Sequence, residues 1–184
     1  MAMARSPAPH PKHARIEFER RFLLDRFPDN ADVAAIRHIC DRYIDGTALR
    51  LREQTHQNGP TLFKLTQKIA ARAPGSQQGF ITTMYIGEEE FRILAQLSGK
   101  ELRKTRYSVP PFGIDVFEGR LQGLILAEAE FDSAAEAARL VLPAFLVQEV
   151  TGDDRFTGGR LINASRADIQ RWLSGRMDIR LGSG

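Results

Sequence analysis

The sequence predicts one α+β domain in which about eight antiparallel strands close into a barrel around a charged interior, with helices packed outside. Charged and apolar side chains alternate with a period of two in several segments, and turn signals separate those segments. Helical spacing occurs only in short stretches between or after them. With 184 residues, of which 42% are hydrophobic, the chain is long enough for a single core.

The first predicted strand, residues 16–24, shows the alternation most fully. Its charged positions are Glu17, Glu19 and Arg21, and its apolar positions include Ile16, Phe18 and Phe22. Successive side chains of a strand point to opposite faces, so one face of this strand is charged and the other is apolar.

The same pattern of paired charges returns in four later segments. The charged positions are Arg50 and Arg52, then Lys64 and Lys68, then Lys104 and Arg106, and finally Glu128 and Glu130. If helices cover the apolar faces, closing the sheet turns the charged faces toward a common interior. Burying an unpaired charge costs several kcal/mol, so these groups must be paired, hydrated or occupied by an ionic ligand.

The remaining elements follow from turn and helix signals. Further strands are expected at 41–44, 48–54, 61–68, 80–86, 102–109, 113–118 and 124–131, with a flexible loop at 70–79. Helices are expected at 32–39, 88–97, 133–140 and 166–173. Phe91, Leu94 and Leu97 fall at helical spacing, and Ser133 with Glu136 has the spacing of a capping box.

Residues 1–14, rich in Pro, Ala and His, are expected to form a disordered tail, and residues 15–184 a single domain. The net charge of +3 permits an anionic ligand, but the basic residues do not form a run, so no nucleic acid is expected. No apolar run is long enough to span a membrane. The lone Cys40 excludes an internal disulfide and suits a reducing compartment, so a cytoplasmic location is expected. A homodimer stays open, because two-fold dimers are the commonest symmetric assembly.

The charged pairs indicate which ligands the interior would bind. Carboxylate pairs suit hard divalent cations, and Arg and Lys pairs suit phosphate oxygens, so together they predict a metal and polyphosphate site. Each pair taken alone is more typical of a solvated strand face. Glu128 and Glu130 could be structural partners of the arginines, and Arg155 could pair with a neighbouring aspartate.

Residues 17–21, Glu-Phe-Glu-Arg-Arg, resemble the ExExK signature of the CYTH, or triphosphate tunnel metalloenzyme, superfamily. The basic pairs and the late Glu-x-Glu follow in the family's order. Residues 104–107, 115–119 and 128–131 resemble the second half of its small bacterial members. The resemblance covers nearly all of the predicted domain, from about residue 15 to about residue 161, and the ordered set is far more specific than one motif.

This resemblance implies a tunnel-shaped barrel that hydrolyses a triphosphate, inorganic triphosphate foremost, by metal-activated water without a covalent intermediate. It implies that Mg²⁺ or Mn²⁺ is held by Glu17, Glu19, Asp115, Glu128 and Glu130. The implied phosphate path consists of Arg50, Arg52, Lys64, Lys68, Lys104, Arg106 and Arg155, and the implied catalytic residues are Arg21 and Tyr43. For Asp115 a turn role is an equal alternative, and for Tyr43 packing in the barrel is the alternative.

Two positions depart from the family pattern. Arg21 replaces the signature lysine, and an arginine stays protonated and cannot accept a proton. Thr82 and Thr83 stand where relatives carry an acidic pair. A non-catalytic polyphosphate or nucleotide-binding module is therefore an alternative to hydrolysis, and adenylate cyclase and thiamine triphosphatase activities are further ones within the family.

Overall fold

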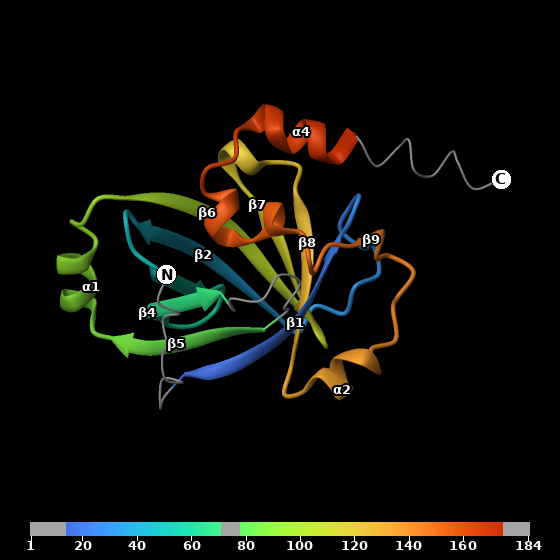
Figure 1. Ribbon diagram of the computed structural model, residues 1–184, viewed down its shortest axis with the longest axis horizontal. Helices are drawn as coiled ribbons and strands as arrows, with labels where there is room; N and C mark the ends of the chain where they lie inside the picture. The colour runs from blue at the N-terminus through green and yellow to red at the C-terminus, as the bar shows by residue number, and fades with distance from the viewer. Residues whose placement is uncertain (1–13, 71–77, 175–184) are drawn as a thin grey trace, which may run out of the picture.

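A computed structural model describes residues 14–70 and 78–174, and nine strands in these ranges form one sheet with short helices around it (Figure 1). The strands are β1 (Arg15–Leu23), β2 (Ala35–Ile44), β3 (Leu49–His56), β4 (Thr61–Ala70), β5 (Gln78–Ile86), β6 (Gly99–Val109), β7 (Phe112–Phe117), β8 (Ile125–Phe131) and β9 (Gln148–Glu149). The helices are α1 (Glu88–Leu94), α2 (Ala134–Ala138), α3 (Gly158–Leu161) and α4 (Arg166–Ser174), with 3₁₀ turns η1 (Gly119–Leu121) and η2 (Asp154–Phe156). The predicted tail, apart from residue 14, and residues 71–77 of the loop predicted at 70–79 lie outside the described residues. Of the ends of that loop, residue 70 belongs to β4 and residues 78 and 79 belong to β5.

The strands are arranged in the order β5-β4-β3-β2-β6-β7-β8-β1-β9. Every described pairing is antiparallel. Strand β1 pairs with β8 through residues 18–23 and also with β5 through residues 15–18, so it contacts strands from both ends of the series. The predicted α+β class, an antiparallel sheet with a few helices, is confirmed.

The predicted helix at 32–39 is wrong. Strand β2 begins at Ala35 and pairs along its length with both β3 and β6. The apolar spacing of Val33, Ala35 and Ile36 suggested a helical turn, but it is too short to stabilise a helix alone. Two rows of interstrand hydrogen bonds and the β-branched Ile36, Ile39 and Ile44 favour the strand instead.

The other predicted helices are present but differ in length. Helix α1 ends at Leu94 rather than 97, and α2 covers only 134–138. The Ser133 side chain caps α2 by accepting a hydrogen bond from the Glu136 backbone N–H at 3.2 Å, as its spacing predicted. No helix within residues 14–70 and 78–174 is long and apolar enough to cross a membrane.

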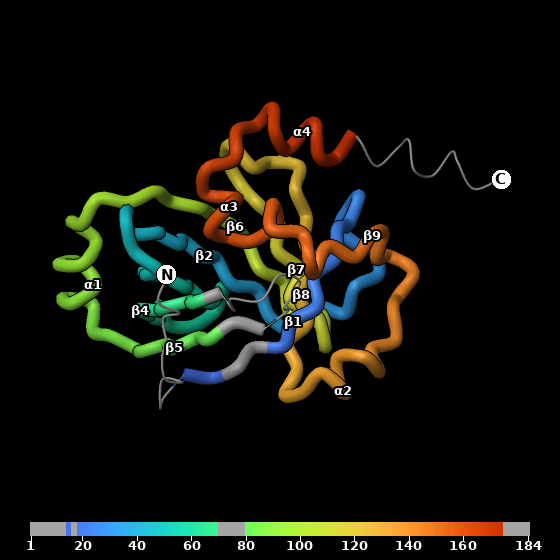
Figure 2. Tube along the Cα trace, in the orientation of Figure 1, coloured from blue at the N-terminus to red at the C-terminus, as the bar shows by residue number. Residues whose placement is uncertain are grey.

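Two apolar clusters hold the sheet in place. One lies on the outer faces of β1, β7 and β8 and includes Phe22, Leu24, Phe112, Ile114, Ala127 and Ala129, packed against residues 140–146. The other joins the ends of β1, β6, β7 and β8 to the C-terminal segment, which returns over β6 and β7 after β9 (Figure 2). Its members include Leu23, Leu102, Phe117, Leu126, Phe156, Leu161 and Ile169.

Candidate functional site

The face of the sheet opposite the outer apolar cluster carries a chain of ion pairs between neighbouring strands. At its centre is Glu128 of β8. Its two carboxylate oxygens accept hydrogen bonds from Arg21 Nε at 3.0 Å and Arg106 Nη2 at 2.5 Å. Arg21 also donates to Glu19, its neighbour on the same face of β1. Burial raises the pKa of Glu128, but Lys104, Arg106 and Arg21 outweigh it, so its pKa lies well below the usual range and it stays ionised.

Asp115 continues this chain on β7. It is fully buried, and its oxygens accept hydrogen bonds from Arg106 Nε and Nη2, both at 2.6 Å, and from Lys104 Nζ. Asp115 lies within the strand, so the turn role considered for it is wrong. Burial lowers the pKa of Lys104, and the Asp115 carboxylate opposes this shift. With several donors on its two oxygens, Asp115 orients the Lys104 and Arg106 side chains.

A second ion pair, on β2 and β3, joins the same face. Asp41 is 1% exposed and accepts two hydrogen bonds from Arg52, from Nε at 2.6 Å and from Nη2 at 2.8 Å, while Arg50 Nε lies 3.7 Å away. Burial raises the pKa of Asp41, but the guanidinium groups of Arg52 and Arg50 more than reverse that shift. Sequence reasoning placed Asp41 at the start of a predicted strand, 41–44, but gave it no role, because the register that sets it opposite Arg52 depends on the pairing of β2 with β3.

Tyr43 lies on the same face but packs against the C-terminal apolar cluster. Its hydroxyl approaches α3 so closely that a Cβ added at Gly158 would lie 2.0 Å from it. Burial raises the pKa of Tyr43, and the positive charges of Arg50 and Arg52 partly oppose this shift. These contacts favour the packing role for Tyr43 over the orientation of a water molecule.

The predicted metal ligands of β1 and β8 lie opposite one another. Glu19 and Glu130 are direct cross-strand partners, and Lys68 Nζ is 3.8 Å from Glu19. Two carboxylates in direct register repel each other, and a cation between them removes that cost. Glu17 is two residues from Glu19 on β1, although its side chain lies outside the described residues. Over residues 14–70 and 78–174 no three His, Cys, Asp or Glu side chains are grouped closely enough to hold a metal ion.

The basic side chains predicted for the phosphate path separate into two groups. Arg50, Arg52, Lys64, Lys68, Lys104 and Arg106 occupy alternate positions on the charged face of β3, β4 and β6. Arg155 lies instead in η2, where it pairs with Asp153 through hydrogen bonds of 2.5–3.0 Å and lies over Trp172. This geometry favours the alternative reading of Arg155 as a surface ion-pair residue.

Thr82 and Thr83, which stand where relatives carry an acidic pair, lie on β5. Thr83 hydrogen-bonds to the buried Thr66 of β4 at 3.1 Å, so hydroxyl groups occupy this part of the charged face. At the end of the face near Tyr43, Leu23, Leu102, Phe117 and Leu126 continue the alternation of the charged residues and pack against the C-terminal segment. An apolar cluster therefore bounds the charged region at that end.

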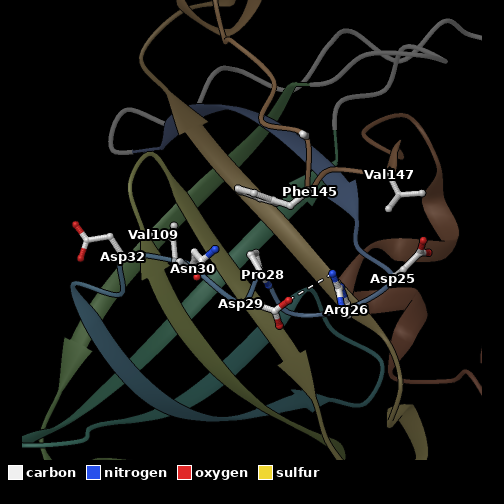
Figure 3. Close-up of a pocket in the computed structure, with 11 residues that line it drawn as sticks. Asp25, Arg26, Pro28, Asp29, Asn30, Asp32, Val109, Phe145 and Val147 are labelled. Carbon is white, nitrogen blue, oxygen red and sulfur yellow. Dashed lines mark ion pairs between the residues drawn. The ribbon is translucent and has the colours of Figure 1, made fainter.

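A surface pocket of 540 Å³ lies away from this region, between the β1–β2 loop and residues 144–147 (Figure 3). Its walls include Arg26 and Asp29, which form an exposed ion pair at 3.4 Å, and none of the predicted site residues. This pocket is therefore separate from the charged face.

No protein-family model matches the chain. The chain is 32% identical over 150 residues to the inorganic triphosphatase of Nitrosomonas europaea, an alignment that covers 76% of this chain and 92% of the relative.

Two crystal structures of a protein called NE1496 are also similar. One is described as a hypothetical protein, with a TM-score of 0.53, 28% identity, and coverage of 81% of this chain and 99% of that one. The other is described as the inorganic triphosphatase NE1496, with a TM-score of 0.52, 26% identity, and coverage of 80% and 95%. The 32% identity to the inorganic triphosphatase of Nitrosomonas europaea extends over most of both sequences. The chain therefore belongs to the family of that enzyme, the CYTH or triphosphate tunnel metalloenzyme superfamily.

Proposed function

We propose that this protein is a divalent-metal-dependent phosphohydrolase that acts on inorganic triphosphate. The observation that carries the proposal is the ion-pair network of β1, β6, β7 and β8, in which cations and carboxylates line one face of the sheet. The 32% identity to an inorganic triphosphatase supports the choice of substrate. The pairing of β1 with β5 supports a closed barrel, with the charged face lining a tunnel.

The cations of this face would bind the phosphates. Those with described positions include Arg21, Arg50, Arg52, Lys64, Lys68, Lys104 and Arg106, and they outnumber the described carboxylates Glu19, Asp41, Asp115, Glu128 and Glu130. Asp41 and Asp115 hold Arg52 and Arg106 in fixed orientations, so less side-chain entropy is lost when a phosphate binds. Arg106 and Arg52 would thus be preorganised donors for phosphate oxygens.

Glu19 and Glu130, together with Glu17, are the residues that would hold Mg²⁺ or Mn²⁺. The ion would neutralise phosphate charge and lower the pKa of a bound water. Glu128 and Asp115 have another role in this proposal, because both carboxylate oxygens of each accept hydrogen bonds from arginine or lysine. They would position the phosphate-binding cations. Glu19 differs, since its Oε1 accepts from Arg21 but its Oε2 lies 3.8 Å from Lys68 Nζ, beyond hydrogen-bond distance.

A non-catalytic triphosphate-binding module is the second candidate. Arg21 cannot accept a proton, and it is held between Glu19 and Glu128. Thr83 places a hydroxyl group where relatives have a carboxylate. These two features favour binding without turnover over the remaining alternatives.

Phosphate release from inorganic triphosphate, with Mg²⁺ or Mn²⁺ and with chelator, tests the proposal. Glu19→Gln and Glu130→Gln should each reduce metal-dependent release at least about tenfold, the loss that even outer-shell metal partners cause. Asp153→Asn is the control, because that exposed carboxylate pairs with Arg155 outside the charged face.

The wild type and the two glutamine variants together separate hydrolysis from binding alone. Tight triphosphate binding without phosphate release by the wild-type protein would establish the binding module. Release that is unchanged in both glutamine variants would refute the metal assignment.

A further inference from the structure

Strand β1 changes its hydrogen-bonding neighbour on one side at Arg21. Residues 15–18 pair with β5, whereas residues 22 and 23 pair with β9, which lies beside the end of β1 (Figure 1). Between these two pairings, the Arg21 backbone N–H donates to Thr151 Oγ1 at 3.0 Å, and the Arg21 carbonyl oxygen accepts from the Val150 N–H at 2.8 Å. The two residues that follow β9 therefore bind both backbone groups of Arg21.

These backbone bonds bear on where the Arg21 side chain lies. Arg21 and Glu128 of β8 are direct cross-strand partners. In an antiparallel pair, side chains approach most closely where the backbone groups point away from the neighbouring strand, as those of Arg21 do toward residues 150 and 151. Arg21 Nε accordingly lies 3.0 Å from Glu128 Oε1, and Arg21 Nη2 donates to Glu19. The direction of the Arg21 side chain thus depends on bonds that its backbone makes on the other side.

The Thr151 hydroxyl is itself oriented. It donates to Glu149 Oε1 at 2.7 Å, and Glu149 also accepts from Arg20 Nε at 3.0 Å and from Arg20 Nη2 at 2.6 Å. The hydrogen bond from Arg20 lowers the pKa of Glu149, and the hydrogen bond from Thr151 acts in the same direction, so Glu149 stays an ionised acceptor. Because the hydroxyl proton points to Glu149, the lone pairs of Thr151 Oγ1 are left for the Arg21 N–H.

The segment that carries Thr151 is anchored. Its neighbour Val150 is 4% exposed and belongs to the C-terminal apolar cluster. The Asp153 N–H donates to the Val150 carbonyl oxygen at 3.1 Å, which closes a turn over residues 150–153. Thr151 therefore lies between a buried residue and a closed turn, and its hydroxyl is a fixed acceptor for β1.

We propose that Thr151 is a positioning residue for Arg21. Its hydroxyl fixes the Arg21 backbone and thereby holds the Arg21 guanidinium between Glu19 and Glu128, where it would meet a bound phosphate. The assignment rests on the proposed triphosphate site, in which Arg21 is one of the phosphate-binding cations. Without the hydroxyl, the Arg21 side chain would lose more conformational freedom on binding, so triphosphate would bind more weakly.

Triphosphate affinity, measured by calorimetry in the full-length protein, tests this role. Thr151→Val keeps the shape of the side chain but removes the hydroxyl, and it should weaken triphosphate binding about threefold to tenfold, the range that one hydrogen bond gives. Thr151→Ser should retain the wild-type affinity, because the hydroxyl remains. Thr157→Val is the matched control, since the Thr157 hydroxyl donates to the Asp154 carbonyl oxygen at 2.8 Å at the end of η2.

The Arg21→Ala background separates positioning from a purely structural role. This substitution keeps the backbone N–H that Thr151 accepts but removes the guanidinium. If Thr151 acts through the Arg21 side chain, Thr151→Val should cause no further loss of triphosphate affinity in Arg21→Ala. An equal loss with and without the guanidinium would overturn the proposal, and so would wild-type affinity in Thr151→Val.

The NMR signal of the Arg21 Nε–H in the ligand-free protein gives a readout that does not depend on triphosphate. Its exchange with water should be faster in Thr151→Val than in the wild type, Thr151→Ser or Thr157→Val, because a less ordered guanidinium leaves Glu128 more often. If the wild type binds no triphosphate, the proposed function is refuted, while faster exchange in Thr151→Val still supports the positioning of Arg21. Unchanged exchange in Thr151→Val overturns it.

Discussion

The ion pair between Asp41 and Arg52 allows a quantitative prediction. Asp41 is 1% and Arg52 8% exposed, and two hydrogen bonds of 2.6 and 2.8 Å join them. Removing one charge of a buried pair costs about 3–5 kcal/mol, because the other charge stays buried and unpaired. Asp41→Asn keeps the shape and one acceptor oxygen, so we expect the lower limit, about 3 kcal/mol. In a chain of this size that lowers Tm by about 6–12 °C.

Urea unfolding at pH 7 and thermal unfolding measure this change. Asp153→Asn is the control, because its ion pair with Arg155 is exposed and should contribute at most about 1 kcal/mol. The reasoning is refuted if Asp41→Asn unfolds within about 1 kcal/mol of the wild type at an unchanged Tm.

The pH dependence of the Asp41→Asn effect shows whether the Asp41 carboxylate stabilises the fold in its ionised form. The pKa of Asp41 is lower in the folded protein than its ordinary value of 3.8, so the carboxylate stabilises the fold above that pH. This contribution is lost as the pH falls from 3.8 through the folded-state pKa. The difference in unfolding free energy between wild type and Asp41→Asn should therefore be constant from pH 7 to about pH 5 and shrink below about pH 4. A difference that grows on acidification would contradict the assigned ion pair.

Two further predictions concern residues whose roles the structure reassigns. Gly158→Ala should lower the unfolding free energy by about 1–3 kcal/mol, because the new Cβ would meet the Tyr43 hydroxyl. Adding Tyr43→Phe should recover part of this loss. Losses that are additive in urea unfolding would contradict the contact between Tyr43 and Gly158. Arg155→Ala should leave triphosphate affinity within about twofold of wild type, because Arg155 pairs with Asp153 outside the charged face. A tenfold loss of triphosphate affinity, measured by calorimetry, would place Arg155 in the phosphate path after all.

Much of the charged face could be predicted from the sequence. The period of two placed Arg21, Lys104, Arg106 and Glu128 on one face, and all four meet in one ion-pair network. The prediction failed where a local signal was ambiguous. Residues 32–39 have a short apolar spacing that suits one helical turn, and pairing with β3 and β6 overrides it.

The sequence by itself determined which side chains share a face, because alternation along a strand is a local property of the backbone. It also indicated the family, which the 32% identity to an inorganic triphosphatase shows. Only the tertiary structure decided which carboxylate meets which cation. Asp41 faces Arg52, and Asp115 faces Arg106, because the register between strands sets these contacts. That register depends on hydrogen bonds and packing along the whole sheet, which no single segment of the sequence encodes.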